Sequence, residues 1–439
     1  MENTENAWRA HVVLLPLPFH GHINPMLNFS AHLASKGIKV TLAIPLSIFN
    51  SVEGQKNLVT IEPYYDGYEK EGGDWTIDSY MEMFKEIGSK NVSKIIEAHQ
   101  NSKHPVKCLV YSSVFPLALE IAKLHGLIGA SFFTQSCAVN ALYYHLHLGT
   151  PLQGTMFSLP GIPLLGVQDL PLVFIDNDEN GVVRRVLLSQ FTNISEIDWL
   201  LFNTYEMLEN EVVQWLGKQL QQKMITIGPT VHFDEQLPFG LTPSIEWLNT
   251  KETGSVVFVS FGSVVKLSEE QIQELAWGLN MSNKYFLWVL RKNEEHKLPA
   301  NFKISEKGLV IPWCMQLQVL ANKAMGCFVT HCGWNSTVEA LSLGVPMVAI
   351  PKFTDQPTNA KYVQDVWKVG VRAKADEKGI VRKGEIVKCI KDVMEGERSD
   401  KMRENAVMWK ELAKEALDQG GSSDVATDKF INTLVSHGL

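Results

Sequence analysis

The sequence of 439 residues lacks the signatures of several common protein classes. Its six cysteines form no CxxC pair and show no zinc-ligand spacing, which argues against a disulfide framework or a zinc module and is typical of a cytoplasmic protein. No GxxxxGK(S/T) loop is present, which excludes a P-loop NTPase. There is also no GxGxxG after the first predicted strand and no Tyr-x-x-x-Lys site, so a nucleotide-dependent oxidoreductase or epimerase has no support.

Long apolar runs and basic clusters are missing as well. The first ten residues are polar, and the segment His11–Phe19 that follows is too short and too rich in proline for a signal peptide or a membrane span. The net charge of −8 and the lack of a lysine- and arginine-rich cluster argue against a nucleic-acid-binding surface. We therefore expect a cytoplasmic monomer that binds neither nucleic acid nor membranes.

What the sequence does contain is an alternation of strand and helix patterns. Hydrophobic residues make up 45% and charged residues 20%, as in ordinary globular proteins, and the length predicts two or three domains. The alternation predicts doubly wound parallel α/β sheets. Strands are expected at 12–17, 38–44, 106–111, 130–133, 199–203 and 224–227, and helices at 23–35, 115–125 and 206–222.

One stretch interrupts this alternation. Residues 228–243 contain several prolines and glycines, which is typical of a connection between domains. We place the interdomain linker at 236–245, between an N-terminal domain (1–235) and a C-terminal domain (246–423). Helices are expected from Met402 onward, with a break at Gly420–Ser423.

The segment Trp313–Gln356 carries the most information about function. A short apolar run at 327–330 predicts a buried strand that ends at His331, and a helix pattern follows at once. We expect Asn335 or Ser336 to cap this helix and a glycine to end it, before a second buried strand begins.

Polar side chains gather at one edge of this predicted unit. In an open parallel sheet, ligands bind at the carboxyl ends of the strands, where His331 and the pair Asp355–Gln356 would both emerge. The first helix turn offers unpaired N–H groups and a partial positive charge, which suit an anion such as phosphate. Glu339 and Gln316 can bond sugar hydroxyls, and Trp313 offers a flat face for a base ring. So many polar and aromatic groups at one helix N-terminus predict a ligand site.

This segment resembles the signature box of the plant family 1 glycosyltransferases, which glycosylate small molecules with UDP-sugars. Similarity extends to PFHGHINP near the start, FFTQS from Phe132, IGPT from Ile227 and SVVFVSFGS from Ser255. The resemblance implies a GT-B fold, in which two Rossmann-like doubly wound α/β domains face each other across a cleft. It also implies that the first domain binds the acceptor, that the second binds the UDP-sugar, and that the last helix, 424–439, packs back on the first domain.

The resemblance also implies roles around the donor. UDP-glucose is the expected co-substrate, because glutamine at the end of the box usually accompanies glucose, and neither a cofactor nor a metal is expected. The residues implied for the base and ribose are Trp313, Gln316 and Glu339; for the diphosphate His331, Asn335, Ser336 and nearby Ser263; and for the hexose Asp355, Gln356, Trp334 and Thr134.

A second chemical site is expected in the turn after the first strand. His22 matches the family's catalytic base for an inverting transfer, and histidine suits the removal of a proton from a hydroxyl acceptor. His20, in the same turn, is the alternative, as a merely polar turn residue. Relatives place an aspartate that orients this histidine just after the strand corresponding to 106–111, whereas this chain has Ser112.

The absence of the aspartate at position 112 leaves three explanations open. Ser112 slows turnover, or another group orients His22, or the acceptor is already an anion, such as a carboxylic acid with a pKa of ~4, and needs little deprotonation. The acceptor is therefore a phenol, a terpenoid or steroid hydroxyl, or a carboxylic acid, and a catalytically impaired or non-catalytic UDP-sugar-binding protein is the competing hypothesis. Aromatic residues that fit either an acceptor pocket or an ordinary core are Phe19, Tyr80, Phe84, Phe115, Tyr143 and Phe174.

A DxD triplet at Asp176–Asp178 is the remaining motif. Such a triplet binds manganese in a different, metal-dependent glycosyltransferase fold. Here it lies in a hydrophilic stretch that continues with Glu179, Asn180 and Gly181, which favours a solvated loop.

Overall fold

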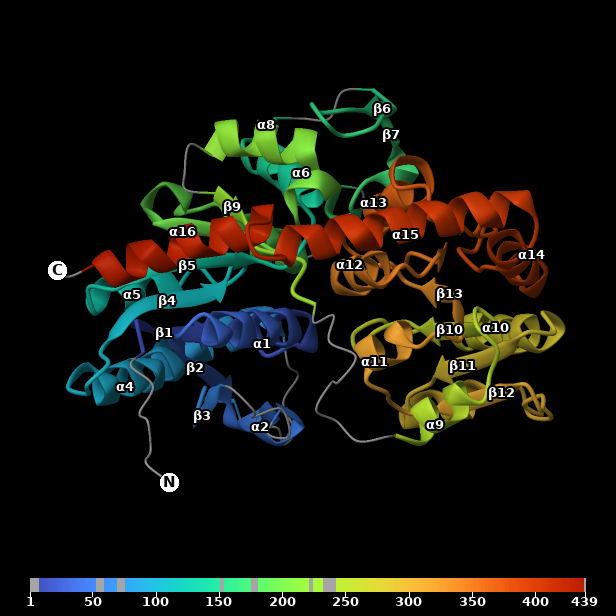
Figure 1. Cartoon of the computed structure of the whole chain (residues 1–439), viewed down its shortest axis with the longest axis horizontal. Coiled ribbons are helices and arrows are strands. Elements are labelled where there is room, and N and C mark those ends of the chain that lie inside the picture. The colour runs from blue at the N-terminus through green and yellow to red at the C-terminus, as the bar shows by residue number, and fades with distance from the viewer. Residues whose placement is uncertain are drawn as a thin grey trace.

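The computed structural model describes residues 8–52, 59–68, 76–150, 154–174, 181–220, 224–231 and 242–437. Two parallel sheets are built from these residues, one from the first half of the chain and one from the second, each flanked by helices (Figure 1). The predicted pair of doubly wound α/β units is therefore confirmed. A helix long and apolar enough to cross a membrane is not found among the described residues.

The first sheet has seven described strands, all parallel, and its central strands are buried except at Lys107, as their apolar runs predict. In spatial order they are β3 (Thr60–Tyr64), β2 (Ile38–Pro45), β1 (Ala10–Leu15), β4 (Val106–Ser112), β5 (Ile128–Phe133), β8 (Trp199–Phe202) and β9 (Met224–Thr226). The accompanying helices are α1 (His20–Ser35), α2 (Leu46–Val52), α3 (Ile77–Met83), α4 (Ser89–Gln100), α5 (Ala118–Leu124), α6 (Cys137–His147), α7 (Val182–Ser189) and α8 (Asn210–Leu220).

The second sheet has six described strands, again all parallel. In spatial order they are β12 (Gly308–Ile311), β11 (Tyr285–Val289), β10 (Val256–Ser260), β13 (Met325–Thr330), β14 (Met347–Ala349) and β15 (Gly370–Arg372). The helices of this half are α9 (Pro243–Asn249), α10 (Glu269–Met281), α11 (Gln316–Ala321), α12 (Trp334–Leu343), α13 (Gln356–Lys361), α14 (Lys383–Met394), α15 (Glu397–Leu417) and α16 (Ser422–Ser436).

Both sheets change winding direction at one point, and these two points locate the site. The strand order reverses between β1 and β4 in the first sheet and between β10 and β13 in the second. At such a switch point the loops at the carboxyl ends of the two strands diverge and leave a crevice for a ligand. His22 follows β1 and Ser112 ends β4, whereas Ser263 follows β10 and His331 follows β13.

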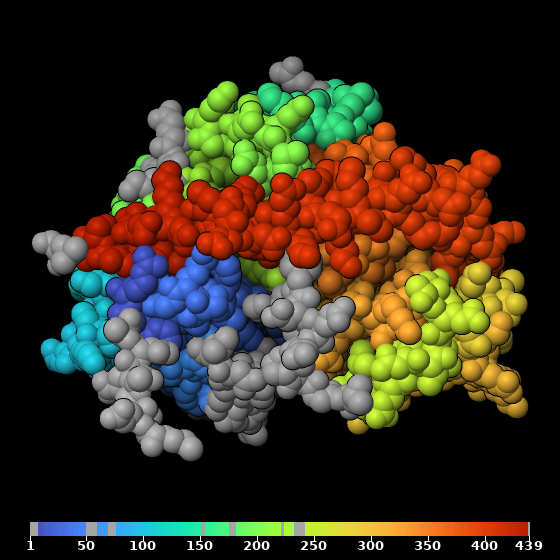
Figure 2. Space-filling model, viewed as in Figure 1, coloured from blue at the N-terminus to red at the C-terminus, as the bar shows by residue number. Residues whose placement is uncertain are grey.

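The C-terminal helices join the two halves. In Figures 1 and 2, α15 and α16 form a continuous red band across both parts of the molecule. Helix α15 packs on α12 of the second half, whereas α16 packs on β9 and β1 of the first. The rings of Trp199 and Phe430 lie 5.7 Å apart, and the Ser423 hydroxyl donates to the Gly228 carbonyl at 2.5 Å. The predicted break between the helices is confirmed at 418–421.

Polar contacts also tie the halves together beneath this band. The indole N–H of Trp334 donates to the Asn203 carbonyl at 2.7 Å. The guanidinium of Arg372 contacts the buried carboxylate of Asp169 at 2.6 Å. These side chains lie in opposite halves of the chain, so the interface is both hydrogen-bonded and ionic.

Some expected boundaries differ from the structure. Helix α1 begins at His20 rather than at residue 23, because the N–H groups of His22 and Ile23 already bond to the Phe19 carbonyl. The predicted cap of α12 is wrong, since Gly333 is its N-cap and no side chain caps it. Most of the expected linker, 236–245, lies outside the described residues.

Candidate functional site

His22 lies in the first turn of α1, at the carboxyl edge of the first sheet. Its imidazole is half-buried, and burial lowers the pKa of His22 to about 4. Its Nδ1 lies 3.4 Å from the hydroxyl of Thr134, just beyond β5. His20, at the exposed start of the same helix, is the less suitable of the two for proton transfer in a cleft.

Ser112 ends β4 without any solvent exposure. Its hydroxyl accepts a hydrogen bond from the backbone N–H of Leu17 at 2.9 Å and lies 3.6 Å from the sulfur of Met26. The side chain at the position of the family's aspartate therefore binds the loop between β1 and α1, and not the imidazole of His22.

On the donor side, the turn from β13 to α12 is unusually tight. Cys332 has a φ of 62°, a left-handed conformation that costs a residue with a side chain on the order of 1–3 kcal/mol. The His331 ring lies between two glycines, because a Cβ on Gly262 would stand 3.0 Å from it and one on Gly333 only 2.6 Å. Burial lowers the pKa of His331 to about 4, so the ring is neutral at pH 7, and its one N–H bonds to the backbone carbonyl of Ser260.

Two residues expected near the ribose, Gln316 and Glu339, lie together with Ser336, which was expected at the diphosphate. The Gln316 amide donates to the Ser336 hydroxyl at 3.0 Å and to the Glu339 carboxylate at 2.7 Å. Burial raises the pKa of Glu339 to about 7. Trp313 stands nearby in the sequence with 68% of its surface exposed, which leaves its ring face open to a planar group.

The loop after β14 orients the pair expected at the hexose. Thr354 has a φ of 41°, and Asp355 accepts hydrogen bonds from the Thr354 hydroxyl and, at 2.7 Å, from the amide of Asn359. The side-chain Oε1 of Gln356 accepts from the backbone N–H groups of Lys352 and Phe353 at 2.9 and 2.8 Å. Asn359, which also donates to the Cys332 carbonyl, joins the two loops of the site. Asn359 was not among the residues predicted from the sequence. Its position four residues after Asp355, one helical turn along, is the feature of the sequence that could have indicated this contact.

Two further residues expected on the donor side are Trp334 and Ser263. The indole of Trp334, which was expected beside the sugar, is buried between the two halves and bonds to the Asn203 carbonyl. Only its backbone N–H is directed at the site, where it bonds to the carboxylate of Asp355. Ser263 is exposed in the loop after β10, and its carbonyl accepts from Arg291 at 2.6 Å.

One hydrogen bond connects the two switch points. The amide of Asn335, in the first turn of α12, donates to the carbonyl of Gly21 at 2.8 Å. Gly21 is the immediate neighbour of His22, so the predicted base and the predicted phosphate site face each other across this contact. This contact has no signal in the sequence, because it joins residues more than 300 positions apart.

The aromatic residues proposed for the acceptor pocket fall into two groups. Tyr80, Phe84, Phe115 and Tyr143 are at most 1% exposed, and the rings of Phe84 and Phe115 pack 4.2 Å apart, so these residues form core in this structure. Phe19 and Phe174 are half-buried.

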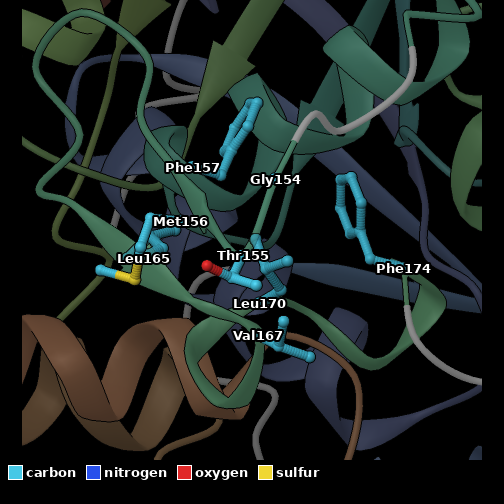
Figure 3. Close-up of a pocket in the computed structure, with 8 residues that line it drawn as sticks. All are labelled: Gly154, Thr155, Met156, Phe157, Leu165, Val167, Leu170 and Phe174. Carbon is cyan, nitrogen blue, oxygen red and sulfur yellow. The ribbon is translucent and has the colours of Figure 1, made fainter.

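Phe174 also lines a cavity of about 210 Å³ between the short β6–β7 hairpin (Met156–Phe157 and Leu165–Gly166) and the loop that follows it (Figure 3). In Figure 3 the rings of Phe157 and Phe174 stand at opposite sides of this apolar space. The N–H of Leu172 bonds to the carbonyl of Thr354, so the cavity borders the Asp355 loop.

The last feature considered is metal ligation. No group of three or more His, Cys, Asp or Glu that fits a metal ion is found in the part of the chain that the structure describes. The DxD triplet Asp176–Asp178 lies outside the described residues.

Comparison with known proteins gives consistent matches along the chain. Residues 204–418 match the model of the family described as UDP-glucoronosyl and UDP-glucosyl transferase, and residues 9–53 match the N-terminal glycosyltransferase domain. UDP-glucosyltransferase 74AE2 of Panax ginseng is 43% identical, with 98% of this chain and 99% of that protein covered. Mogroside I-E synthase of Siraitia grosvenorii is also 43% identical, over 97% of this chain and 98% of that protein.

Solved structures agree with these matches. Os79 of O. sativa, in complex with U2F and trichothecene, superposes with a TM-score of 0.88 at 33% identity and covers 96% of this chain and all of that one. UGT2 of Phytolacca americana, with UDP-2fluoro-glucose and pterostilbene, gives a TM-score of 0.85 at 25% identity, over 97% of this chain and 99% of that one. The two facing switch points, the box from Trp313 to Gln356 and these matches have one explanation: the chain belongs to the plant UDP-glycosyltransferases of the GT-B fold.

Proposed function

We propose that this enzyme transfers glucose from UDP-glucose, with inversion, to a small acceptor whose oxygen is already acidic, and above all to a carboxylic acid. His22 is the group that accepts whatever proton the acceptor still carries. Phenols and terpenoid or steroid hydroxyls are slower acceptors in this proposal, because they must lose a proton during attack.

The observation that carries this proposal is the environment of His22. The pKa of His22 is lowered to about 4 by burial alone, and a carboxylate that would offset this effect is not found beside the ring in the described residues. The hydroxyl of Ser112 is engaged with Leu17. A base with so low a pKa removes a proton poorly from a phenol, whose pKa is ~10, whereas a carboxylic acid of pKa ~4 is ionised at pH 7.

The donor side supports the binding of UDP and a reaction without metal. Ser336, Glu339 and Gln316 form one hydrogen-bonded cluster that suits a ribose. The N-terminus of α12, with no side-chain cap, offers backbone N–H groups to the diphosphate. Charge-assisted hydrogen bonds contribute about 1.5–3 kcal/mol each, so several of them stabilise departing UDP without a cation.

The relatives support glucose as the transferred sugar. Several of them are named as glucosyltransferases, and one, from Arabidopsis thaliana, is a flavonol 7-O-beta-glucosyltransferase with 43% identity. In the proposed step, the acceptor oxygen bonds to C1 of glucose from the face opposite UDP. The bond between C1 and the β-phosphate oxygen breaks, and UDP keeps its electron pair.

The test compares benzoate with phenol as acceptors for the native enzyme and for Ser112→Asp. A carboxylate at this position strengthens the base, so we expect kcat/KM to rise about 10- to 100-fold on phenol and to change less than about twofold on benzoate. Ser113→Asp is the matched control, because its side chain points away from Ser112 and bonds to Gln190. An equal gain on both acceptors contradicts the acidic-acceptor proposal.

A separate experiment tests transfer itself. Native enzyme in excess over UDP-glucose is mixed with each acceptor in a single turnover, with and without EDTA. We expect the benzoate ester to form in both samples. UDP-glucose binding without any product would favour a UDP-sugar-binding protein instead, and loss of activity in EDTA would contradict the metal-independent mechanism.

A further inference from the structure

The orientation of His22 needs an explanation in this chain. A partner on one ring nitrogen of a histidine favours the tautomer whose other nitrogen can act as the base. Ser112 does not supply that partner, because its hydroxyl accepts the N–H of Leu17. In the part of the chain that is described, the hydrogen bond of the His22 side chain goes to Thr134, at 3.4 Å.

The sheet explains why Thr134 reaches this ring. Strand β5 lies beside β4, with Phe132 in register with Ser112, and β4 in turn lies beside β1. The chain leaves β5 at Phe133 and enters α6 at Cys137, capped by Ser136, so Thr134 lies at the carboxyl edge of the sheet. The start of α1 lies over the same edge, and Thr134 is 9% exposed there.

We propose that Thr134 is the positioning residue of His22, with Nδ1–H of the imidazole donating to the threonine hydroxyl oxygen and the Nε2 lone pair left for the acceptor. This inference rests on the proposed role of His22 as base. A neutral hydroxyl orients the ring but stabilises the imidazolium much less than a carboxylate does. The enzyme therefore keeps a correctly oriented but weak base, which suits an acidic acceptor.

A different role for Thr134 is implied by the resemblance, namely contact with the transferred sugar. The two roles predict different results. A sugar contact changes KM for UDP-glucose and does not depend on residue 112. A positioning residue changes the tautomer of His22 and the chemical step, and becomes dispensable once a carboxylate at residue 112 takes its place.

The first experiment measures the His22 tautomer by ¹⁵N NMR of histidine-labelled protein in the absence of substrate, with the His22 signal assigned by its loss in His22→Gln. We expect Nδ1–H in the native protein and in Thr134→Ser, and a mixture of tautomers in Thr134→Val. Thr226→Val, in the edge strand β9, is the matched control and leaves the signal unchanged. An unchanged tautomer in Thr134→Val overturns the inference, even if glucosyl transfer is confirmed.

The second experiment measures transfer to phenol. We expect Thr134→Val to lower kcat about tenfold with KM for UDP-glucose unchanged, and Thr134→Ser to retain activity. In the Ser112→Asp background, the same Thr134→Val change is expected to cost less than about twofold. A rise in KM for UDP-glucose, or the same loss in both backgrounds, assigns Thr134 to the sugar and overturns the inference. Because the NMR measurement needs no turnover, it separates this failure from a failure of the proposed reaction.

Discussion

At the scale of single residues, burial sets the charge of the side chains expected to bind the nucleotide. The pKa of His331 is lowered to about 4, whereas that of Glu339 is raised to about 7, both mainly by desolvation. Above pH 7 the site therefore holds a neutral imidazole and an ionised carboxylate, and the carboxylate is suited to the two hydroxyls of a ribose.

This pair of pKa values predicts how UDP binding depends on pH. Only the ionised form of Glu339 accepts two ribose hydroxyls, and a pKa of about 7 means that its ionised fraction rises about tenfold between pH 6 and pH 8. His331 and the Cys314 thiol, whose pKa burial raises to about 12, keep their charges over this interval. We expect calorimetry to show up to about tenfold tighter UDP binding at pH 8 than at pH 6.

The matched control is Glu339→Gln, which keeps the shape of the side chain and removes its titration. Titration of the phosphates of UDP itself contributes equally to the pH dependence of UDP binding by both proteins. The difference between their pH profiles therefore reports Glu339, and parallel profiles would contradict the assignment of Glu339 to the ribose.

At the scale of elements, the site depends on how the helices at its edges begin. Helix α6 begins three residues after Thr134, and its first N–H groups are bound by a buried carboxylate from another segment. Glu209 accepts hydrogen bonds from Cys137 and Ala138 at 3.0 and 2.8 Å and is 4% exposed. Its charge also matches the positive end of the helix dipole.

We therefore expect Glu209→Gln to destabilise the protein by about 1–3 kcal/mol, because the amide removes the charge and one of the two acceptors. Glu206→Gln, an exposed substitution three residues earlier, is the control and is expected to have little effect. Urea unfolding followed by circular dichroism measures both. Equal free energies of unfolding for the two variants would show that the contact to α6 contributes nothing.

At the scale of the whole molecule, contacts between distant segments fix the position of the two halves relative to each other. Asp169 is buried, and it meets Arg372 at 2.6 Å and Lys361 at 3.7 Å from the other half. The hydroxyl of Thr358 donates to the Asp169 carbonyl at 2.7 Å. Asp169 lies in the sequence between Val167 and Leu170, which line the cavity of Figure 3, so these contacts anchor the segment that lines this cavity.

Removal of the arginine leaves the Asp169 carboxylate buried with a more distant cation. We expect Arg372→Met to lower the free energy of unfolding by about 3 kcal/mol. The double variant Arg372→Met/Asp169→Asn is expected to recover part of this loss, since no buried charge remains. Scanning calorimetry is the measurement, and Arg382→Met, at an exposed ion-pair cluster of the second half, is the control with a smaller expected loss. Equal losses for the two arginines would contradict an interface role for Arg372.

Much of this architecture was predictable from local patterns. The buried strands that end at Thr330 and Ser112 read as apolar runs, and the helices read as periodic patterns between turn residues. The box from Trp313 to Gln356 indicated the family, because its polar residues lie within one short segment of the sequence. The N-cap of α12, Gly333, was not predicted, because a glycine makes no side-chain hydrogen bond and so lacks the polar side chain by which an N-cap is recognised in a sequence.

The sequence by itself determined the strand–helix alternation, the family and the residues of the donor box, because these depend on neighbours within a few turns of chain. Only the tertiary structure decided that Ser112 binds Leu17, that Thr134 meets His22 and that Asn335 reaches Gly21. Each of these contacts joins segments about 100 to 300 residues apart. Their partners are selected by strand register and by the packing of one half on the other, and neither is encoded in any local pattern.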